Sequence, residues 1–258
     1  MSILSLFLTR YSATQIDFQR PAKKSFWRAA AVCCLLTCNA ASAEVQAPQY
    51  RQFWLWAGVK PQPVLQQAEQ LYVLQGQING DRQGRVSFTR QGPAVMSAQA
   101  QVWLAYRVQT LVWDEAVLRS IRNQLQSWQR AGRVPLGIQL DFDASSYQLG
   151  RYADFLRQLR EQLPAQYRLS ITGLLDWTRT GDVATLNSLT GTVDELVVQT
   201  YQGRHSVAGY ERYLASLSQL RIPFKVGLVQ GGEWDVDWQR RLQQSPYYRG
   251  EVVFLLNP

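Results

Sequence analysis

Strand-like and helix-like segments alternate along most of this chain, and this alternation limits its possible folds more than any other feature. Eight segments rich in Val, Leu, Tyr and Trp are bounded by Gly or Pro, as strands commonly are. They comprise residues 52–58, 71–78, 102–111, 136–143, 167–176, 195–202, 224–231 and 251–257. Apolar residues at helical spacing follow several of them, in residues 114–132, 145–164, 210–220 and 237–244.

Strands that alternate with helices favour right-handed crossovers and a parallel sheet. Eight strands is the number that closes a (β/α)8 barrel, or TIM barrel, so we expect an α/β fold of this type. Helices are weak or missing after the first two strands, so the barrel would be small or slightly degenerate there. An open doubly wound parallel sheet is the alternative. Either fold would form a single domain over residues 44–258.

Residues 1–43 have the features of an N-terminal extension with a signal peptide. A basic flank of Lys23, Lys24 and Arg28 precedes the short apolar residues 29–36, and the sequence Ala-Ser-Ala at 41–43 supplies small residues for cleavage. The apolar stretch is too short to span a bilayer. We therefore expect an exported protein, periplasmic or secreted.

The same segment permits a second interpretation, a lipoprotein signal. Leu35-Leu36-Thr37-Cys38 resembles a lipoprotein box, in which Cys38 would be acylated and attach the protein to a membrane. The other two cysteines of the chain, Cys33 and Cys34, also lie here. Cleavage after residue 43 would remove all three, which excludes disulfides, thiol nucleophiles and cysteine metal sites from the mature protein.

The net charge gives little reason to expect a nucleic-acid partner. The whole chain carries a formal charge of +8, but residues 1–43 contribute five basic residues and one acidic residue. Their removal leaves 22 basic and 18 acidic residues, a charge of +4, with no basic cluster that would bind nucleic acid. The composition, 46% hydrophobic and 18% charged, is that of an ordinary folded protein.

Residues 137–143, Gly-Ile-Gln-Leu-Asp-Phe-Asp, combine an apolar face with an acidic face on one strand. Successive strand side chains point to opposite sides, so Gln139, Asp141 and Asp143 share a face. TIM barrels open at the C-terminal ends of their strands, so this face would look into a cleft. The two carboxylates would lie about 6–7 Å apart, and neighbouring like charges raise one pKa towards the range of a general acid. Alternatively, Asp143 caps the following helix.

Other residues at the same ends of the strands favour a binding cleft. Polar side chains occur there at Arg107, Gln109, Asp176, Gln199 and Tyr201. Tryptophans at or just past strand ends are Trp56, Trp113, Trp177 and Trp234. Indole faces in an open cleft suit sugar rings, although these tryptophans can instead cover the top layer of a barrel.

Two motifs resemble glycoside hydrolase family 18, the chitinase-like TIM barrels. Residues 137–143 resemble the fourth-strand signature G-[IL]-D-[IL]-D-W-E, and residues 198–202, Val-Gln-Thr-Tyr-Gln, resemble the sixth-strand segment M-T-Y-D. The resemblance implies that Asp143 is the catalytic acid, that Asp141 steadies the acetamido group of the substrate, and that Tyr201 orients it. In that family the N-acetyl group of the substrate acts as the nucleophile.

The chain departs from the family pattern at three positions. Gln139 and Gln202 replace acids, and Asp143 is one methylene shorter than glutamate. The chain looks closer to a group of uncharacterised exported bacterial proteins that share the L-D-F-D strand and a late G-G-E-W segment, here residues 231–234. Glu233 within that segment is either the second carboxylate of a conventional glycosidase pair or an ordinary loop acid.

These features favour an exported protein that hydrolyses a glycosidic bond in an envelope polysaccharide or peptidoglycan-like glycan by acid catalysis. The alternative is a carbohydrate-binding barrel without catalysis. The expected catalytic residues are Asp143, Asp141, Tyr201 and Glu233. The expected substrate-binding residues are Gln139, Gln199, Arg107, Asp176, Trp56, Trp113, Trp177 and Trp234.

Cofactor-dependent chemistry is less well supported. A metal-dependent hydrolase usually uses several histidine ligands, and His205 is the only histidine. A nucleotide-sugar transferase that binds Mg²⁺ through Asp141 and Asp143 conflicts with export. No P-loop or dinucleotide-binding motif occurs, so we expect no cofactor.

Overall fold

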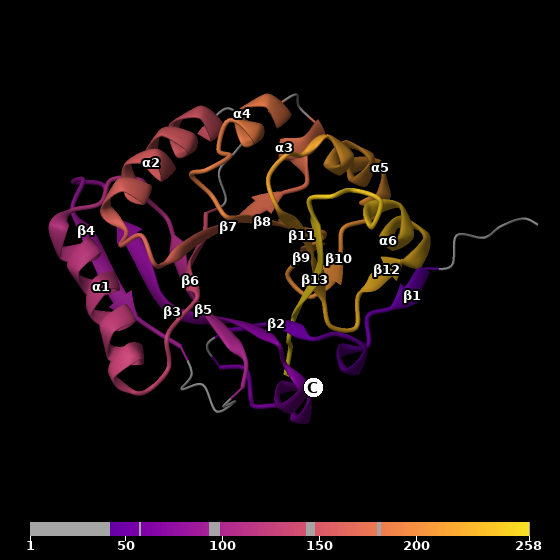
Figure 1. Cartoon of the computed structure of the whole chain (residues 1–258), viewed down its shortest axis with the longest axis horizontal. Coiled ribbons are helices and arrows are strands. Elements are labelled where there is room, and N and C mark those ends of the chain that lie inside the picture. The colour runs from indigo at the N-terminus through magenta and orange to yellow at the C-terminus, as the bar shows by residue number, and fades with distance from the viewer. Residues whose placement is uncertain (1–41, 57, 93–98, 143–147, 180–181, 258) are drawn as a thin grey trace, which may run out of the picture. The chain divides into compact units, whose positions relative to one another are not determined.

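Eight parallel strands close into a barrel in the computed structural model, which describes residues 42–56, 58–92, 99–142, 148–179 and 182–257 (Figure 1). All of these residues belong to one compact unit, residues 39–258. The ring order is β2, β13, β11, β8, β7, β6, β5, β3, and pairing of β2 with β3 closes it. The ring strands are β2 (Gln52–Leu55), β3 (Gln70–Gly80), β5 (Gln101–Val108), β6 (Gly137–Asp141), β7 (Arg168–Leu174), β8 (Glu195–Gln199), β11 (Phe224–Val229) and β13 (Tyr248–Phe254).

The predicted TIM barrel is therefore confirmed, and the open sheet is wrong. The helices are α1 (Glu115–Arg130), α2 (Leu149–Gln162), α3 (Asp176–Arg179), α4 (Val183–Asn187), α5 (Glu211–Leu214) and α6 (Val236–Leu242). Asp114 caps the start of α1, because its side chain accepts a hydrogen bond from the Val117 amide at 2.9 Å. The expected gaps also occur, because a 3-10 helix, Pro63–Gln67, follows β2 and the hairpin strand β4 (Val86–Arg90) follows β3.

Several short strands were not expected from the sequence. β1 (Ser42–Glu44) pairs antiparallel with β12 (Glu233–Asp235), and β9 (Tyr201–Gln202) pairs with β10 (His205–Ser206). The predicted strand 195–202 is therefore two strands, β8 and β9. Residues 1–41 of the expected export segment, which include the three cysteines, lie outside the described residues, as does Asp143.

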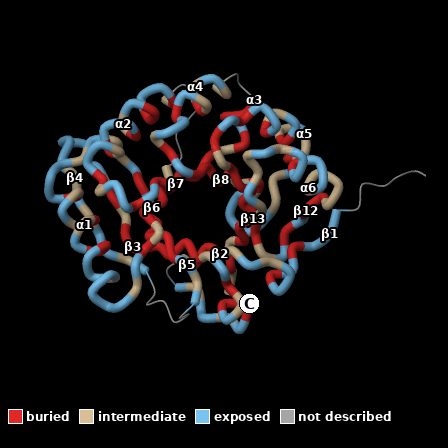
Figure 2. Tube along the Cα trace, in the orientation of Figure 1, coloured by how far each residue is buried: buried red, intermediate tan, exposed pale blue. Residues whose placement is uncertain are grey.

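Buried residues are concentrated along the strands of the ring (Figure 2), and they form two clusters of side chains. The larger cluster includes Ile138 and Leu140 of β6 and Leu156 of α2. A second cluster contains Trp54, Tyr72, Trp103, Val197 and Val252. Tyr72 and Trp103 stack with ring centroids 5.9 Å apart.

Gly227 on β11 makes room for Trp54 in this second cluster. A Cβ atom at Gly227 would lie 2.7 Å from the indole ring of Trp54, closer than a side chain tolerates. The glycine therefore leaves room for the indole of Trp54, and side chains of the second cluster fill the middle of the barrel.

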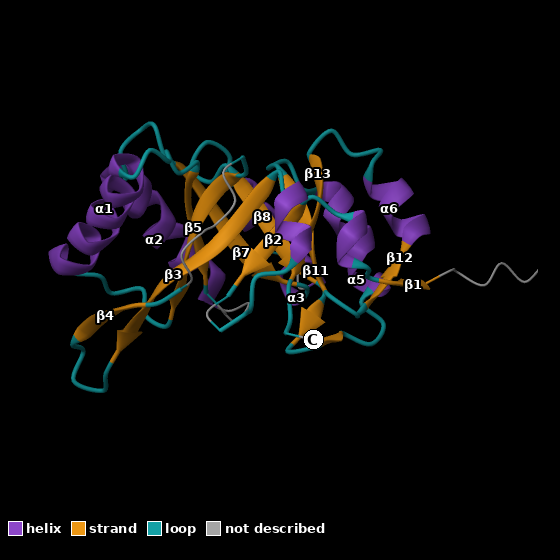
Figure 3. Cartoon of the chain, turned by 90° about the horizontal axis from the view of Figure 1, so that it is seen from below, coloured by secondary structure: helices purple, strands orange, loops and turns teal. Residues whose placement is uncertain are grey.

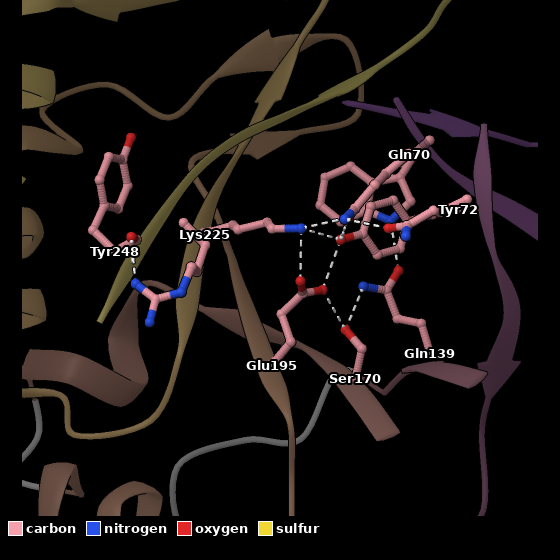
Figure 4. A network of polar contacts seen from close by, with 10 residues as sticks. Gln70, Tyr72, Gln139, Ser170, Glu195, Lys225 and Tyr248 are labelled. Atoms are coloured by element: carbon pink, nitrogen blue, oxygen red, sulfur yellow. Dashed lines mark hydrogen bonds and ion pairs between the residues drawn. The ribbon is translucent and has the colours of Figure 1, made fainter. Parts of the chain in front are cut away.

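A buried ion pair accompanies the aromatic residues (Figure 4). Lys225 Nζ lies 2.7 Å from a carboxylate oxygen of Glu195 and also donates to the Tyr72 hydroxyl and to Gln70 Oε1, each at 2.7 Å. Tyr72 in turn donates to Glu195 at 2.7 Å. Burial lowers the pKa of Lys225, and the Glu195 carboxylate opposes this shift. Burial and the neighbouring Glu195 raise the pKa of Tyr72, which keeps its hydroxyl protonated.

Hydrogen bonds extend from this ion pair across the barrel. Ser170 donates to Glu195 at 2.9 Å, Gln139 Nε2 donates to Ser170 at 2.9 Å, and Trp54 Nε1 donates to Gln139 Oε1 at 2.6 Å. We call the connected set the interior network; its members are Gln70, Tyr72, Lys225, Glu195, Ser170, Gln139 and Trp54. These hydrogen bonds satisfy polar groups that would be costly to bury alone.

Another acid, Glu251 on β13, gives a prediction about pH. Burial raises the pKa of Glu251, while a hydrogen bond from the Tyr248 hydroxyl partly opposes the rise. The folded protein therefore holds the Glu251 proton to a higher pH than the unfolded chain, in which glutamate has a pKa of about 4.3. Its contribution to stability is complete below that pH and is lost as the pH rises through the folded pKa.

Glu251→Gln should accordingly gain stability relative to wild type as the pH rises from about 4 to 7. Glutamine cannot ionise, and its carbonyl can still accept from Tyr248. Urea unfolding across this range measures the free-energy difference. Glu233→Gln is the control because Glu233 is exposed. A difference between Glu251→Gln and wild type that stays constant with pH would contradict the prediction.

Candidate functional site

Asp141 lies at the C-terminal end of β6, with 8% of its surface exposed. Its Oδ1 accepts a hydrogen bond from the Thr172 hydroxyl of β7 at 2.9 Å. Its Oδ2 lies 4.0 Å from Nε of Arg107 on β5, whose side chain is 51% exposed. A hydroxyl and a guanidinium therefore face this carboxylate from the two neighbouring strands.

A row of polar residues crosses the strands at this level. Asp141 is in register with Arg107, Arg107 with Gln77 of β3, and Gln77 with Thr89 of β4. Residues in register on adjacent strands present their side chains to the same face of the sheet. The row therefore continues from the acid of the barrel into the β3–β4 hairpin.

A cavity of about 610 Å³ lies at this end of the barrel, beside β5 and β6. Its lining includes Arg107, Gln109, Asp141, Gln148 and Arg151. The volume is within the range of small-molecule sites, about 300–1,000 Å³. The cavity is therefore lined by hydrogen-bond donors and by both positively and negatively charged side chains.

Aromatic rings gather at the C-terminal ends of other strands. Trp56, just past β2, packs edge-on against Phe254 of β13 with centroids 5.5 Å apart. Tyr201 of β9 lies 5.6 Å from Phe254 and 6.2 Å from Trp54. Trp56, Tyr201 and Phe254 are only partly buried. Phe254 was not among the residues expected from the sequence. It follows Val252 by two residues on a predicted strand, so the two side chains share a face, and this spacing was a usable signal.

Four of the expected substrate-binding residues are not available to a ligand at the barrel mouth. Trp177 and Trp234 are each 1% exposed, so neither can stack on a sugar, and the expectation is wrong for both. Trp177 packs against Tyr152, and Trp234 stacks on Tyr210. These tryptophans follow strands but turn into apolar packing, which a position near a strand end does not reveal.

The other two corrections concern Trp113 and Gln139. Trp113 packs against Phe155 of α2, with ring centroids 4.9 Å apart, and donates to the Thr110 carbonyl, so it lines a small space between α1 and α2. Gln139 is 0% exposed, and both the oxygen and the nitrogen of its side-chain amide form hydrogen bonds within the interior network. It points into the barrel as expected but lies too deep to contact substrate.

Glu233 is separate from the residues around Asp141. It is exposed on β12, which pairs with β1 beside α6, on the other side of the barrel from β6 (Figure 1). Asp176 is exposed at the start of α3, and Gln199 is half-buried at the end of β8. The structure thus brings Asp141 and Arg107 together but does not bring Glu233 to them.

The described residues hold no group of three or more His, Cys, Asp or Glu side chains arranged to bind a metal ion. His205 is exposed on β10. Among the helices that the structure describes, none is both long enough and apolar enough to cross a membrane.

Comparisons with known proteins found one family model and several solved structures that are similar to this chain. Residues 99–218 match the model of a domain of unknown function, DUF3142. No curated protein sequence matches the chain. The spore cortex-lytic enzyme SleL of Bacillus cereus is similar in structure, with 19% identity and a TM-score of 0.41, over 63% of this chain and 43% of SleL.

Two further solved structures resemble this chain over more of its length. The chitinase ICChI of Ipomoea carnea has 14% identity and a TM-score of 0.48, over 79% of this chain and 94% of the chitinase. The xylanase and α-amylase inhibitor protein XAIP-I, solved with trehalose, has 11% identity and a TM-score of 0.48, over 79% and 92% of the two chains.

Proposed function

We propose that this protein is an exported, carbohydrate-active TIM barrel that hydrolyses a glycosidic bond in an envelope polysaccharide or peptidoglycan-like glycan. The observation that carries the proposal is the setting of Asp141. Its carboxylate lies at the C-terminal end of a barrel strand, meets Thr172 and Arg107, and lines a cavity of about 610 Å³. TIM barrels carry their active sites at this end.

In the proposed mechanism Asp143 is the general acid. It follows Asp141 by two residues, so an extended chain would bring both carboxylates to one face. Asp143 would give its proton to the glycosidic oxygen as the bond from that oxygen to the sugar carbon breaks. Water would then form a bond to that sugar carbon and return a proton to the Asp143 carboxylate. Asp141 would stabilise the positive charge that develops on the sugar.

The aromatic residues support a sugar as the ligand. Trp56, Tyr201 and Phe254 are partly buried at the same end of the barrel. Sugar rings present C–H faces that pack on aromatic rings, with hydroxyls at their edges for polar groups. Arg107 and Gln109 in the neighbouring cavity lining are suitable partners for those hydroxyls.

A carbohydrate-binding barrel without catalysis is the second candidate. The observation that favours it is Gln139, which replaces an acid of the family 18 motif and bonds to Trp54 and Ser170 inside the barrel. Asp143 also favours this candidate, because it is one methylene shorter than glutamate. A proton donor misplaced by about 1 Å can lower the rate of the reaction a hundredfold.

One experiment separates these candidates. Wild type and the double variant Asp141→Asn/Asp143→Asn are incubated with purified peptidoglycan and with N-acetylated oligosaccharides, and both bound protein and released reducing ends are measured. If the protein is a hydrolase, wild type releases reducing ends and the double variant does not. A binding barrel binds without release. Wild type that neither binds nor cleaves these glycans would contradict both candidates.

Thr172 provides a narrower test of the same site. Thr172→Val keeps the shape of the side chain but removes the hydroxyl that donates to Asp141. We expect kcat to fall about tenfold, the value of one lost hydrogen bond to a charged group. Thr172→Ser, which restores the hydroxyl, should recover most of the rate. Equal rates for Thr172→Val and wild type would show that Asp141 needs no support from this hydroxyl.

Export is part of the proposal. Val45 is 1% exposed, its amide donates to the Gly232 carbonyl at 2.7 Å, and its carbonyl accepts from Gly231 at 3.0 Å. Cleavage after Ala43 would leave these contacts in place, but it would remove Ser42 and Ala43 from the pairing of β1 with β12. A lipoprotein that begins at Cys38 would keep the whole of β1. N-terminal sequencing of the processed protein distinguishes a chain that begins at residue 44 from a lipoprotein that begins at Cys38.

A further inference from the structure

The β3–β4 hairpin carries polar side chains beyond the strand ring. Residues 70–73 of β3 pair with β2, whereas residues 76–80 pair with residues 86–90 of β4. We call residues 76–91 the ribbon. It projects from the barrel where β3 ends (Figure 3). The ribbon therefore extends one wall of the end that carries Asp141.

A β-bulge decides which ribbon side chains face the same way as Asp141. The register with β5 shifts between Leu74 and Gly76, which inserts Gln75 as an extra residue. Gln75 accepts a hydrogen bond from Trp128 of α1 at 3.0 Å, so it faces the helix. The shift puts Gln77 beside Arg107 and leaves Ile78 buried on the opposite face.

The inner face of the ribbon, which continues the row from Asp141, holds uncharged hydrogen-bonding side chains. They are Gln77, Asn79, Ser87, Thr89 and Gln91. The hydroxyl-bearing Ser87 and Thr89 are exposed. The outer face differs, because Phe88 packs on Tyr106 there and Arg90 shares its side.

Hydrogen bonds hold three of the inner-face side chains, those of Gln77, Asn79 and Gln91, in one arrangement. Gln77 Nε2 donates to Asn79 Oδ1 at 2.8 Å, and Gln91 Nε2 donates to Gln77 Oε1 at 3.3 Å. The hairpin turn is fixed by Asp81, which accepts from the Gln83 and Arg85 amides at 2.9 Å each. A ligand would therefore meet three amide side chains that are already ordered, which reduces the entropy lost on binding.

We propose that the inner face of the ribbon binds an extended, uncharged part of the glycan whose cleavage point lies at Asp141. This inference rests on the proposed function and adds a direction and a substrate class to it. Amides and hydroxyls match sugar hydroxyls in both donor and acceptor capacity. The inner-face residues carry no charge, so an anionic chain would find no counter-charge among them.

The length of the row sets the length of the ligand. From Asp141 on β6 to Thr89 on β4 the row crosses three strand spacings, a distance of about 14 Å. A disaccharide bound at Asp141 would not reach the far edge of this row, whereas a hexasaccharide would. Ribbon variants should therefore affect long oligosaccharides and spare short ones.

The test compares N-acetylglucosamine oligomers of six and two sugars by titration calorimetry, in an Asp143→Asn background that prevents turnover. Ser87→Ala/Thr89→Val removes two exposed hydroxyls with little change in shape. We expect the affinity for the hexamer to fall about tenfold and the affinity for the dimer to stay constant. Arg90→Ala, on the outer face of the same strand, is the matched control and should change neither. Thermal unfolding checks that each variant folds.

The outcomes separate this inference from the proposed function. If the parent protein binds both oligomers and the ribbon variant binds them equally well, the ribbon inference is overturned while the proposed function stands. An equal loss for both lengths also overturns it, because the hydroxyls would then act at the mouth itself. A parent protein that binds neither oligomer overturns both.

Discussion

Replacement of Asp143 by asparagine is expected to lower the rate of glycan hydrolysis by about 10²- to 10⁴-fold, the usual contribution of a general acid. Asparagine has the size and polarity of aspartate but no proton to give to the leaving oxygen. KM should change little, because the proton is transferred only as the bond breaks. Initial rates of reducing-end release from peptidoglycan or an N-acetylated oligosaccharide measure the effect.

Two further variants make this result specific. Asp143→Glu keeps a carboxylic acid, so it should retain measurable turnover that Asp143→Asn lacks. Asp154→Asn removes an exposed carboxylate that pairs with Arg157 on α2, and it should leave the rate unchanged. Identical product formation by wild type and Asp143→Asn would remove Asp143 from the mechanism.

The second large effect concerns stability. Lys225→Met should lower the free energy of unfolding by about 3–5 kcal/mol, because it leaves the Glu195 carboxylate buried without its cation. Tyr72 and Ser170 would still donate to Glu195, but neutral donors replace only part of the lost attraction. For a domain of this size the fall corresponds to a Tm lower by about 10 °C. Urea and thermal unfolding measure it.

A double variant identifies the cause of this loss. Lys225→Met/Glu195→Gln removes both charges and should recover much of the stability, since no unpaired charge remains inside the barrel. Arg240→Met breaks an exposed ion pair with Asp237 and should cost less than about 1 kcal/mol. A loss for Lys225→Met no larger than that for Arg240→Met would show that the buried pair is not what stabilises the interior.

The fold was predictable because its signals are local. Each ring strand is a short apolar run, and α1 follows from apolar spacing and an aspartate at its start. The strand Gly137–Asp141 was placed correctly, and alternation correctly put Gln139 and Asp141 on one face. Alternation gives the face of a side chain but not its depth, so Gln139 proved to be buried in the middle of the barrel.

The remaining features depend on contacts between distant parts of the chain. The pairing of β1 with β12 joins residues far apart in sequence, and nothing in Ser42–Glu44 alone predicts it. The bulge at Gln75 breaks the alternation of β3, which hid the inner face of the ribbon. Trp177 and Trp234 follow strands as expected, yet packing with Tyr152 and Tyr210 turns them away from solvent.

The packing of Trp54 against Gly227 determines how a ligand can enter and leave the barrel. With the middle of the barrel occupied by that indole and its neighbours, nothing can pass from one end of the ring to the other. Under the proposed function, a sugar fragment released near Asp141 leaves through the same end of the barrel by which the glycan enters. The product and the substrate would then compete for the same opening, so accumulated product should slow later rounds of cleavage.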